Sequence, residues 1–242
     1  MNNIILCLSM FLIITTASAD DKGWSYSGNN GPQAWAGLSP EMFACAGKNQ
    51  SPINLTGFVK AQLAPIKISY AAAPGSIVHT GHDIKIEYPA AGSIWVDGVE
   101  FKLKQFHFHA PSENQINGQS FPMEAHFVNV DRDGSITVLA VMFQEGQPNK
   151  ALELLWQNMP AEAGVTNVLP LAFNAETLLP LKRSYYRFNG SLTTPPCAEG
   201  VRWIVFRQPV AVSKEQIAAF TRVIGHPNNR PVQPVNARVV LE

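Results

Sequence analysis

Residues 105–109 read Gln105-Phe106-His107-Phe108-His109, and this stretch decides how the 242-residue chain is expected to fold. Successive side chains of a β-strand point to opposite faces. A strand here therefore places the two histidines on one face and the two phenylalanines on the other. The segment predicts a β-strand that presents a pair of imidazoles from one side of a sheet.

The same two-residue alternation extends to both sides of this stretch and predicts a β-rich chain. Strands are expected at residues 67–70, 84–88, 93–96, 100–109, 124–130, 136–143, 201–207 and 239–241. Asp97-Gly98 and Asp133-Gly134 lie between strand candidates, where hairpin turns belong. Two segments are typical of helices, residues 149–159 and residues 213–224, and Ser213 is an N-cap for the second. With no repeats and no linker-like segment, residues 20–242 are expected to form a single domain.

A third histidine completes a metal-binding pattern. His126 lies on the next expected strand, and if that strand is an antiparallel neighbour of residues 100–109, three imidazoles converge on one point. Three protein ligands and one open position describe a catalytic zinc site, whereas structural sites usually have four ligands. Gln105 shares the face of His107, and Glu124 shares that of His126, so each can accept the second ring N–H and orient the imidazole. The pattern predicts a Zn²⁺ site; histidines that face solvent or a satisfied core are the alternative.

The composition fits a globular chain with a large core and excludes a nucleic-acid partner. Hydrophobic residues make up 46% of the chain and charged residues 15%, the latter below the roughly 25% of average soluble domains. Eighteen basic and eighteen acidic residues cancel. No basic stripe is present that could follow a phosphate backbone.

The first nineteen residues differ from the rest and predict export. Residues 4–14 are almost entirely apolar and lead to Ala17-Ser18-Ala19, a small-residue cleavage pattern. The apolar run is shorter than the about 20 residues of a membrane span. Residues 1–19 are therefore expected to be a signal peptide, with no membrane span after its removal. Because Met1-Asn2-Asn3 lacks Lys and Arg, an uncleaved N-terminal anchor is the alternative.

Cysteine usage agrees with export. Cys7 lies within residues 1–19, which leaves Cys45 and Cys197. In an oxidising compartment two cysteines form either a disulfide or a pair of buried thiols.

Several segments resemble the alpha carbonic anhydrases. One family signature is similar to residues 105–109, Ser112-Glu113-Asn114 and residues 124–128; a second is similar to residues 189–197, followed by Val201 and Trp203. Further matches occur in family order at Trp24-x-Tyr26, Asn30-Gly31-Pro32, residues 47–53 and Asn229-Arg230-Pro231. Together they cover essentially the whole chain after the expected signal peptide.

This resemblance implies a fold and a reaction. The fold would be a mainly β single domain, with a large, central, twisted and mostly antiparallel sheet, a few short surface helices and zinc at the base of a conical cavity. The reaction would be the reversible hydration of carbon dioxide to bicarbonate and a proton, by attack of zinc-bound hydroxide on carbon dioxide. Carbon dioxide and bicarbonate would be the small-molecule partners, and both a monomer and a homodimer remain open.

The resemblance also implies roles for individual residues. His107, His109 and His126 would bind zinc, with Gln105 and Glu124 behind them. Thr193 would donate its hydroxyl proton to Glu113, so that its oxygen is left to accept a hydrogen bond from the hydroxide and orient it. The apolar pocket for carbon dioxide would be lined by Val128, Val138, Leu192, Thr194, Val201 and Trp203, for which an ordinary core position is the alternative.

Three more implications concern proton transfer, redox state and location. His82 aligns with the family's proton-shuttle histidine, and imidazole titrates near neutrality; the neighbouring His79 is the alternative. Cys45 and Cys197 match the disulfide of exported members. Ala110-Pro111, Asn114 and Tyr186 are similar to the compact bacterial branch, which favours the periplasm, with secretion to the medium as the other destination.

Two other classes of function compete with this interpretation. His107-x-His109-x-x-x-Glu113 also fits the first motif of the cupins, in which Glu113 would be a fourth ligand to iron or manganese. Residues 192–196 and the pairing of Glu124 with His126 have no place in a cupin, however. A metal-free binding module related to carbonic anhydrase is the second alternative, although all three zinc histidines are present.

Overall fold

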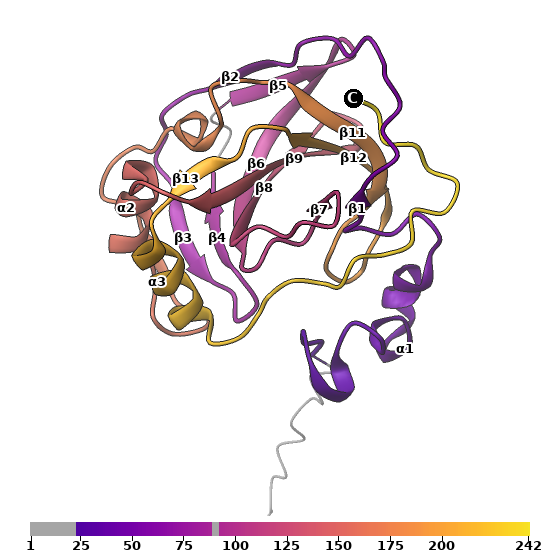
Figure 1. Ribbon diagram of the computed structural model, residues 1–242. Helices are drawn as coiled ribbons and strands as arrows, with labels where there is room; N and C mark the ends of the chain where they lie inside the picture. Colours follow the sequence, from indigo (N-terminus) through magenta and orange to yellow (C-terminus); the bar gives the residue numbers. More distant parts are fainter. Residues whose placement is uncertain (1–22, 89–91) are drawn as a thin grey trace, which may run out of the picture.

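A computed structural model describes residues 23–88 and 92–242 of the chain (Figure 1). The expected signal peptide, residues 1–19, lies outside the described residues. Within the described part, no helix is long and apolar enough to cross a membrane.

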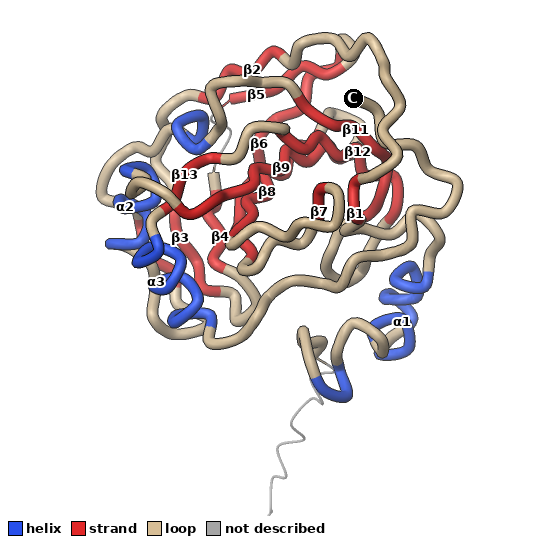
Figure 2. Tube along the Cα trace, in the orientation of Figure 1, coloured by secondary structure: helices blue, strands red, loops and turns tan. Residues whose placement is uncertain are grey.

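One large twisted sheet dominates the structure (Figures 1 and 2). Its strands follow the order β10-β3-β4-β6-β8-β9-β12-β11, while β13 pairs with β9, and β5 pairs with β2 and β6. The strands are β2 (Lys67–Tyr70), β3 (Ser76–His79), β4 (Ile84–Glu87), β5 (Gly92–Val96), β6 (Val99–His109), β8 (Met123–Val130), β9 (Ile136–Glu145), β10 (Thr166–Val168), β11 (Tyr185–Ser191), β12 (Glu199–Phe206) and β13 (Val210–Val212). Both β12 and β13 run parallel to β9, and the other pairs in this sheet are antiparallel. The expected mainly β, mostly antiparallel fold class is confirmed.

Within residues 23–88 and 92–242 the helices are few and short. They are α1 (Trp35–Leu38), α2 (Lys150–Gln157) and α3 (Lys214–Ile224), together with the 3₁₀ segments η1 (Gly28–Asn30), η2 (Pro40–Ala46) and η3 (Ala175–Leu178). The Asn149 side chain caps α2, and Ser213 with Gln216 forms a capping box on α3. Both predicted helices are thus confirmed, and they lie together at one side of the sheet in Figure 1.

The strand predictions were mostly correct, with one error and several omissions. Residues 239–241 do not form the expected terminal strand; Leu241 makes only isolated bridges, to Val59 and Arg187. The omitted strands are β3, β10, β11, β13 and the small parallel pair β1 (Asn54–Leu55) and β7 (Gln115–Ile116). The Asp97-Gly98 turn between β5 and β6 is confirmed, with φ of 52° and 80°, as a type I′ hairpin requires.

β6 changes register half-way along its length. Its pairing with β8 is irregular between Leu103 and Gln105, where one extra residue, Lys104, lies exposed. Leu103 before this bulge and Phe106 after it are both buried in the main hydrophobic cluster. A bulge of this kind moves the alternation of a strand by one residue. It is why Gln105 and the two histidines that follow face away from the main cluster.

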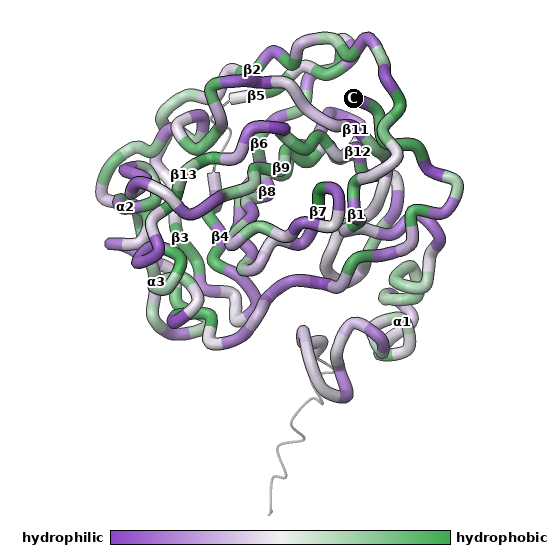
Figure 3. The backbone as a smooth tube through the Cα atoms, viewed as in Figure 1, coloured by the Kyte–Doolittle hydropathy of each residue, from purple (hydrophilic) through white to green (hydrophobic). Residues whose placement is uncertain are grey.

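The two faces of the sheet are covered by different apolar clusters. The main cluster includes Phe106, Phe127 and Phe143 and receives α2 and α3. A second cluster contains Val138, Ala140 and Trp203. Stretches of β8 and β9, which contribute to both, are among the hydrophobic parts of the tube in Figure 3. The metal-binding histidines lie on the face of the second cluster.

Candidate metal centre

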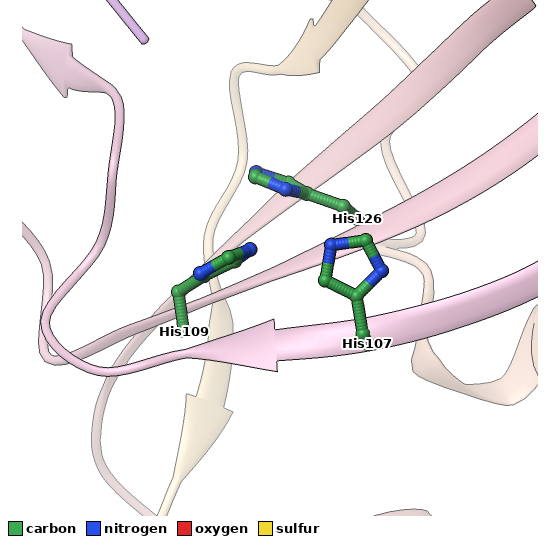
Figure 4. A group of neighbouring side chains, drawn as sticks. All are labelled: His107, His109 and His126. Carbon is green, nitrogen blue, oxygen red and sulfur yellow. The ribbon is translucent and has the colours of Figure 1, made fainter. Parts of the chain in front are cut away.

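The register of the sheet brings the three histidines together. His107 of β6 is the direct cross-strand partner of His126 of β8, and His109 lies two residues further along the same face. One nitrogen from each ring falls in a group whose members lie within 4.8 Å of one another. The three rings point toward one another in Figure 4. The convergence expected from the sequence is confirmed.

The second nitrogen of each ring is occupied by a different group. Nδ1 of His107 lies 2.8 Å from Oε1 of Gln105, and Nδ1 of His109 lies 2.7 Å from the carbonyl oxygen of Asn228. Nε2 of His126 lies 2.9 Å from Oε1 of Glu124, a close contact outside good hydrogen-bond alignment. These contacts leave Nε2 of His107, Nε2 of His109 and Nδ1 of His126 for a metal ion.

Among the buried side-chain atoms that lack a hydrogen-bond partner in the described residues, two lie next to each other at the point of convergence. They are Nε2 of His109 and Oε2 of Glu113, which lie 3.5 Å apart. Burial lowers the pKa of all three imidazoles, which favours the neutral form that binds a metal. Three neutral imidazoles with no cysteine among them suit a zinc ion with one open coordination position. The residues present therefore fit the metal.

Three hydrogen-bond donors hold the carboxylate of Glu124 in place. Its Oε2 accepts the backbone N–H groups of Glu113 and Asn114, and its Oε1 accepts the side-chain amide of Asn114, each at 2.8 Å. Burial raises the pKa of Glu124, and the hydrogen bonds from Asn114 oppose that change. No role for Asn114 was expected from the sequence; in the structure it fixes the carboxylate that contacts His126.

Asn228 is a second residue that sequence reasoning missed. Besides its carbonyl contact with His109, its side-chain oxygen accepts the N–H of Ala110 at 2.8 Å. Its amide nitrogen donates to the carbonyl oxygens of Phe108 and His82. Asn228 therefore links a metal ligand to the segment that carries His82. Its position directly before the Asn229-Arg230-Pro231 match was the available signal.

Glu113 lies at the centre of a buried polar cluster beside the histidines. Its Oε1 accepts the backbone N–H of Arg230 at 2.7 Å, and its Oε2 lies 3.8 Å from Nδ1 of His126. Burial raises the pKa of Glu113 well above its usual range, and hydrogen bonds from Arg230 and from the Thr193 side chain oppose this. Thr193 itself is buried. The structure thus brings Thr193 and Glu113 together next to the metal ligands.

The expected substrate-pocket residues form a row beside the metal ligands. Val128 pairs with Val138, and Val138 pairs with Trp203, across three adjacent strands. The Trp203 ring lies 4.8 Å from that of His126. Five of the six expected residues belong to or pack on the second apolar cluster: Val128, Val138, Leu192, Val201 and Trp203. Thr194 is half-buried.

The two histidines considered for proton transfer have different surroundings. The ring of His82 stacks on Trp24, with centroids 3.8 Å apart and an interplanar angle of 16°. His79 is buried; its Nδ1 accepts the N–H of Gly81 at 3.0 Å, and its Nε2 lies 3.4 Å from the carbonyl of Val223. His79 is thus committed to contacts that hold the fold. His226 is exposed, and its ring lies 6.1 Å from that of Tyr26.

Cys45 and Cys197 form a disulfide, with Cα atoms 4.9 Å apart. The bond joins η2 to the loop of residues 192–198, which carries Thr193. The buried Arg230 guanidinium donates to the carbonyl of Cys45 at 3.1 Å and to Oε1 of Gln50 at 2.8 Å. Gln50 in turn donates from Nε2 to the carbonyl of Cys197 at 3.1 Å. The disulfide therefore closes the cluster that contains Glu113 and Thr193.

Removal of this disulfide is expected to destabilise the protein strongly. The bond joins residues separated by 152 positions, and closing so long a loop stabilises by up to about 5 kcal/mol in the chain-entropy model. Urea unfolding of the Cys45→Ser/Cys197→Ser variant should show a lower midpoint than the oxidised protein. A reducing agent should lower the midpoint of the unmodified chain and leave that of the variant unchanged. Equal midpoints for both oxidised proteins would contradict the prediction.

Three imidazoles on a mixed β-sheet, a buried Glu–Thr pair and an adjacent apolar row define a mononuclear zinc lyase of the carbonic anhydrase type. The family model for eukaryotic-type carbonic anhydrases matches residues 30–242. The chain belongs to this family, the alpha carbonic anhydrases, and is a carbonic anhydrase that hydrates carbon dioxide at a three-histidine zinc site.

Relatives and solved structures agree with this assignment. The chain is 46% identical to a carbonic anhydrase of Neisseria gonorrhoeae over 240 residues, covering 98% of this chain and 95% of the relative. The alpha carbonic anhydrase of Thermovibrio ammonificans, solved with the inhibitor sulfanilamide, has a TM-score of 0.90 and 52% identity, covering 91% of this chain and 99% of that one. The alpha carbonic anhydrase of Photobacterium profundum has a TM-score of 0.86 and 44% identity, covering 91% and 100%.

Proposed function

We propose that individual residues of this carbonic anhydrase carry the reaction as follows: His107, His109 and His126 hold zinc, Thr193 and Glu113 orient the nucleophile, and His82 relays the proton. The observation that carries this proposal is the group of three histidine nitrogens within 4.8 Å of one another. Bound zinc supplies a Lewis acid that lowers the pKa of a coordinated water, a property for which carbonic anhydrases are the reference case.

Thr193 is proposed to act only as a hydrogen-bond acceptor toward the nucleophile. A carboxylate only accepts, so a Thr193 hydroxyl that donates to Glu113 has no proton left for another acceptor. Its oxygen then accepts a hydrogen bond from the attacking oxygen species, which orients a lone pair of that species toward carbon dioxide. The backbone N–H of Arg230 fixes Glu113 at 2.7 Å, so the geometry is in place before substrate binds.

Carbon dioxide needs little more than an apolar surface that excludes water. The substrate is small, neutral and apolar. Trp203 is buried beside His126, and buried Val138 is the cross-strand partner of Trp203. We place the carbon dioxide pocket along Val128, Val138, Leu192, Thr194, Val201 and Trp203. The water-excluding row and the metal ligands lie on one face of the sheet, so the electrophile and the nucleophile meet there.

His82 is proposed to pass the proton of each turnover to buffer. At low buffer concentration, His82→Ala should lower kcat for hydration by on the order of 100-fold, because a positioned imidazole is lost from a proton-transfer step. kcat/KM for carbon dioxide should stay nearly constant, since the proton leaves after the chemical step. Added imidazole should restore kcat, and His226→Ala should behave like the unmodified enzyme. An unchanged kcat for His82→Ala at low buffer would assign the relay elsewhere.

The decisive experiment on the whole proposal is stopped-flow hydration of carbon dioxide with metal analysis of the purified protein. We expect rapid hydration with about one zinc per chain. Iron or manganese in place of zinc would support the cupin-like chemistry, and folded, zinc-loaded protein without hydration would support a binding module.

Export and the location of the mature protein belong to the proposal as well. We propose that residues 1–19 are removed as a signal peptide and that residues 20–242 act as a single domain in the periplasm. The Cys45–Cys197 disulfide supports an oxidising compartment. Mass spectrometry of the protein from periplasmic extract, with Asp20 as the first residue, is the test. Sedimentation of that material would distinguish a monomer from a homodimer.

A further inference from the structure

Three charged side chains follow one another on the face of β4 that lies beside the metal ligands. Asp83 directly precedes β4, and Lys85 and Glu87 lie within it. Ile84, Ile86 and Tyr88, which alternate with them, are buried. We call Asp83, Lys85 and Glu87 the charged row. None of the three is needed to cover the main core.

The pairing of β4 with β6 fixes where the charged row lies. Lys85 is the cross-strand partner of the metal ligand His107, and Glu87 is the partner of Gln105. Partners in an antiparallel pair have side chains on the same face, about 5 Å apart at Cβ. The same two-residue step brings Asp83 to the level of His109. Two opposite charges therefore flank the metal centre from one neighbouring strand.

Local contacts hold the members of the charged row in place. Oδ1 of Asp83 accepts the hydroxyl of Thr80 at 2.6 Å, which holds the carboxylate in place. Lys85 is paired with Glu87 at 3.0 Å, and its side chain is 28% exposed, against 54% for Glu87.

The reaction interconverts a neutral molecule and an anion, so fixed charges beside the centre affect its two sides differently. We infer, on the basis of the proposed function, that Asp83 and Lys85 are specificity-determining residues that set the ion affinity of the metal centre with opposite signs. The Asp83 carboxylate weakens the binding of anions such as bicarbonate and strengthens that of the metal cation. The Lys85 ammonium does the reverse. Carbon dioxide, which has no charge, is hardly affected by either.

The test uses two probes of opposite charge, thiocyanate and zinc, on Asp83→Asn and Lys85→Gln. Zinc affinity of the metal-free protein is measured by competition with a chelator, and thiocyanate affinity by inhibition of hydration. Charges one strand from the centre, partly screened by water, predict shifts of about two- to fivefold. Asp83→Asn should bind zinc more weakly and thiocyanate more tightly, and Lys85→Gln should do the opposite. Asn keeps an oxygen that can accept the Thr80 hydroxyl, so the fold should be retained.

The controls are matched changes far from the centre. Asp133→Asn lies in the turn between β8 and β9, and Lys102→Gln is exposed on β6 at its pairing with Val130; both should leave the two affinities unchanged. A shift of the same sign in Asp83→Asn and Lys85→Gln, or no shift in either, overturns the inference. An unmodified protein that neither retains zinc nor hydrates carbon dioxide would instead refute the proposed function, so the two failures are distinguishable.

Discussion

His107→Ala is expected to lose both zinc and activity. The change removes one of three ligands from a site that has no other nitrogen or sulfur donor among the described residues within the ligand group. Without the metal, the pKa of water is no longer lowered, so hydration should fall to background, a loss of at least about 1,000-fold. Metal analysis of the purified variant should show far less than one zinc per chain, and stopped-flow measurement should show the loss of hydration.

The control for this prediction is a histidine that is absent from the metal group. His226 is exposed, so His226→Ala should keep zinc and activity. Circular dichroism should show the fold of His107→Ala intact, because the sheet is held by the apolar clusters on its two faces. Retention of zinc and of rapid hydration in His107→Ala would exclude His107 as a ligand.

Thr193→Val should reduce activity while leaving the metal in place. Valine has nearly the shape of threonine and lacks the hydroxyl that joins Glu113 to the nucleophile. Loss of one preorganised hydrogen bond at a reacting oxygen costs on the order of 100-fold, and we expect this loss in kcat/KM for carbon dioxide. Zinc content should remain at one per chain, since Thr193 is not a ligand.

Two companion variants separate orientation from packing. Thr193→Ser restores the hydroxyl and should recover most of the activity, which a purely structural role for the methyl group would not allow. Glu113→Gln keeps the shape of the carboxyl but can donate to the threonine, so it should lose activity as well. If Thr193→Val were as active as the unmodified enzyme, the proposed orientation of the nucleophile would be wrong.

Much of the sheet could be predicted from side-chain alternation. The strands that alternate clearly, such as β4 and β8, were located to within a residue or two. β3 (Ser76–His79) was missed because Ile77 and Val78 are adjacent apolar residues, so the segment does not alternate as the equally short β4 does. Residues 239–241 are apolar enough for a strand, but the segment makes only single bridges at Leu241. Whether a short apolar segment joins a sheet depends on the neighbours it finds, which local sequence does not contain.

The metal ligands could be predicted from the sequence more readily than the residues that hold them in place. His-x-His on one strand and His126 on the next give the convergence, because two adjacent strands hold the ligands and the register follows from alternation. Asn228 reaches His109 across 119 positions, and Arg230 reaches Glu113 across 117. Both contacts use backbone groups, which carry no mark of their role in the residue type. Asn114 acts through Glu124, and a polar residue in a loop gave no signal of that.

The bulge in β6 has a consequence for how this enzyme can vary. Lys104 supplies no ligand and no core side chain, so many residues can replace it. Its removal would also leave the ligands in place, because Leu103 already faces the main cluster and Gln105 faces the metal centre. Without Lys104 these two residues would be consecutive in a regular strand and would keep their partners Asn129 and Val128. Loss of a residue between Gln105 and His109 has the opposite effect, since it moves one ligand to the other face of the sheet. The bulge is therefore the place on this strand where chain length can vary without displacing the imidazoles, whereas the spacing of the two histidines is fixed.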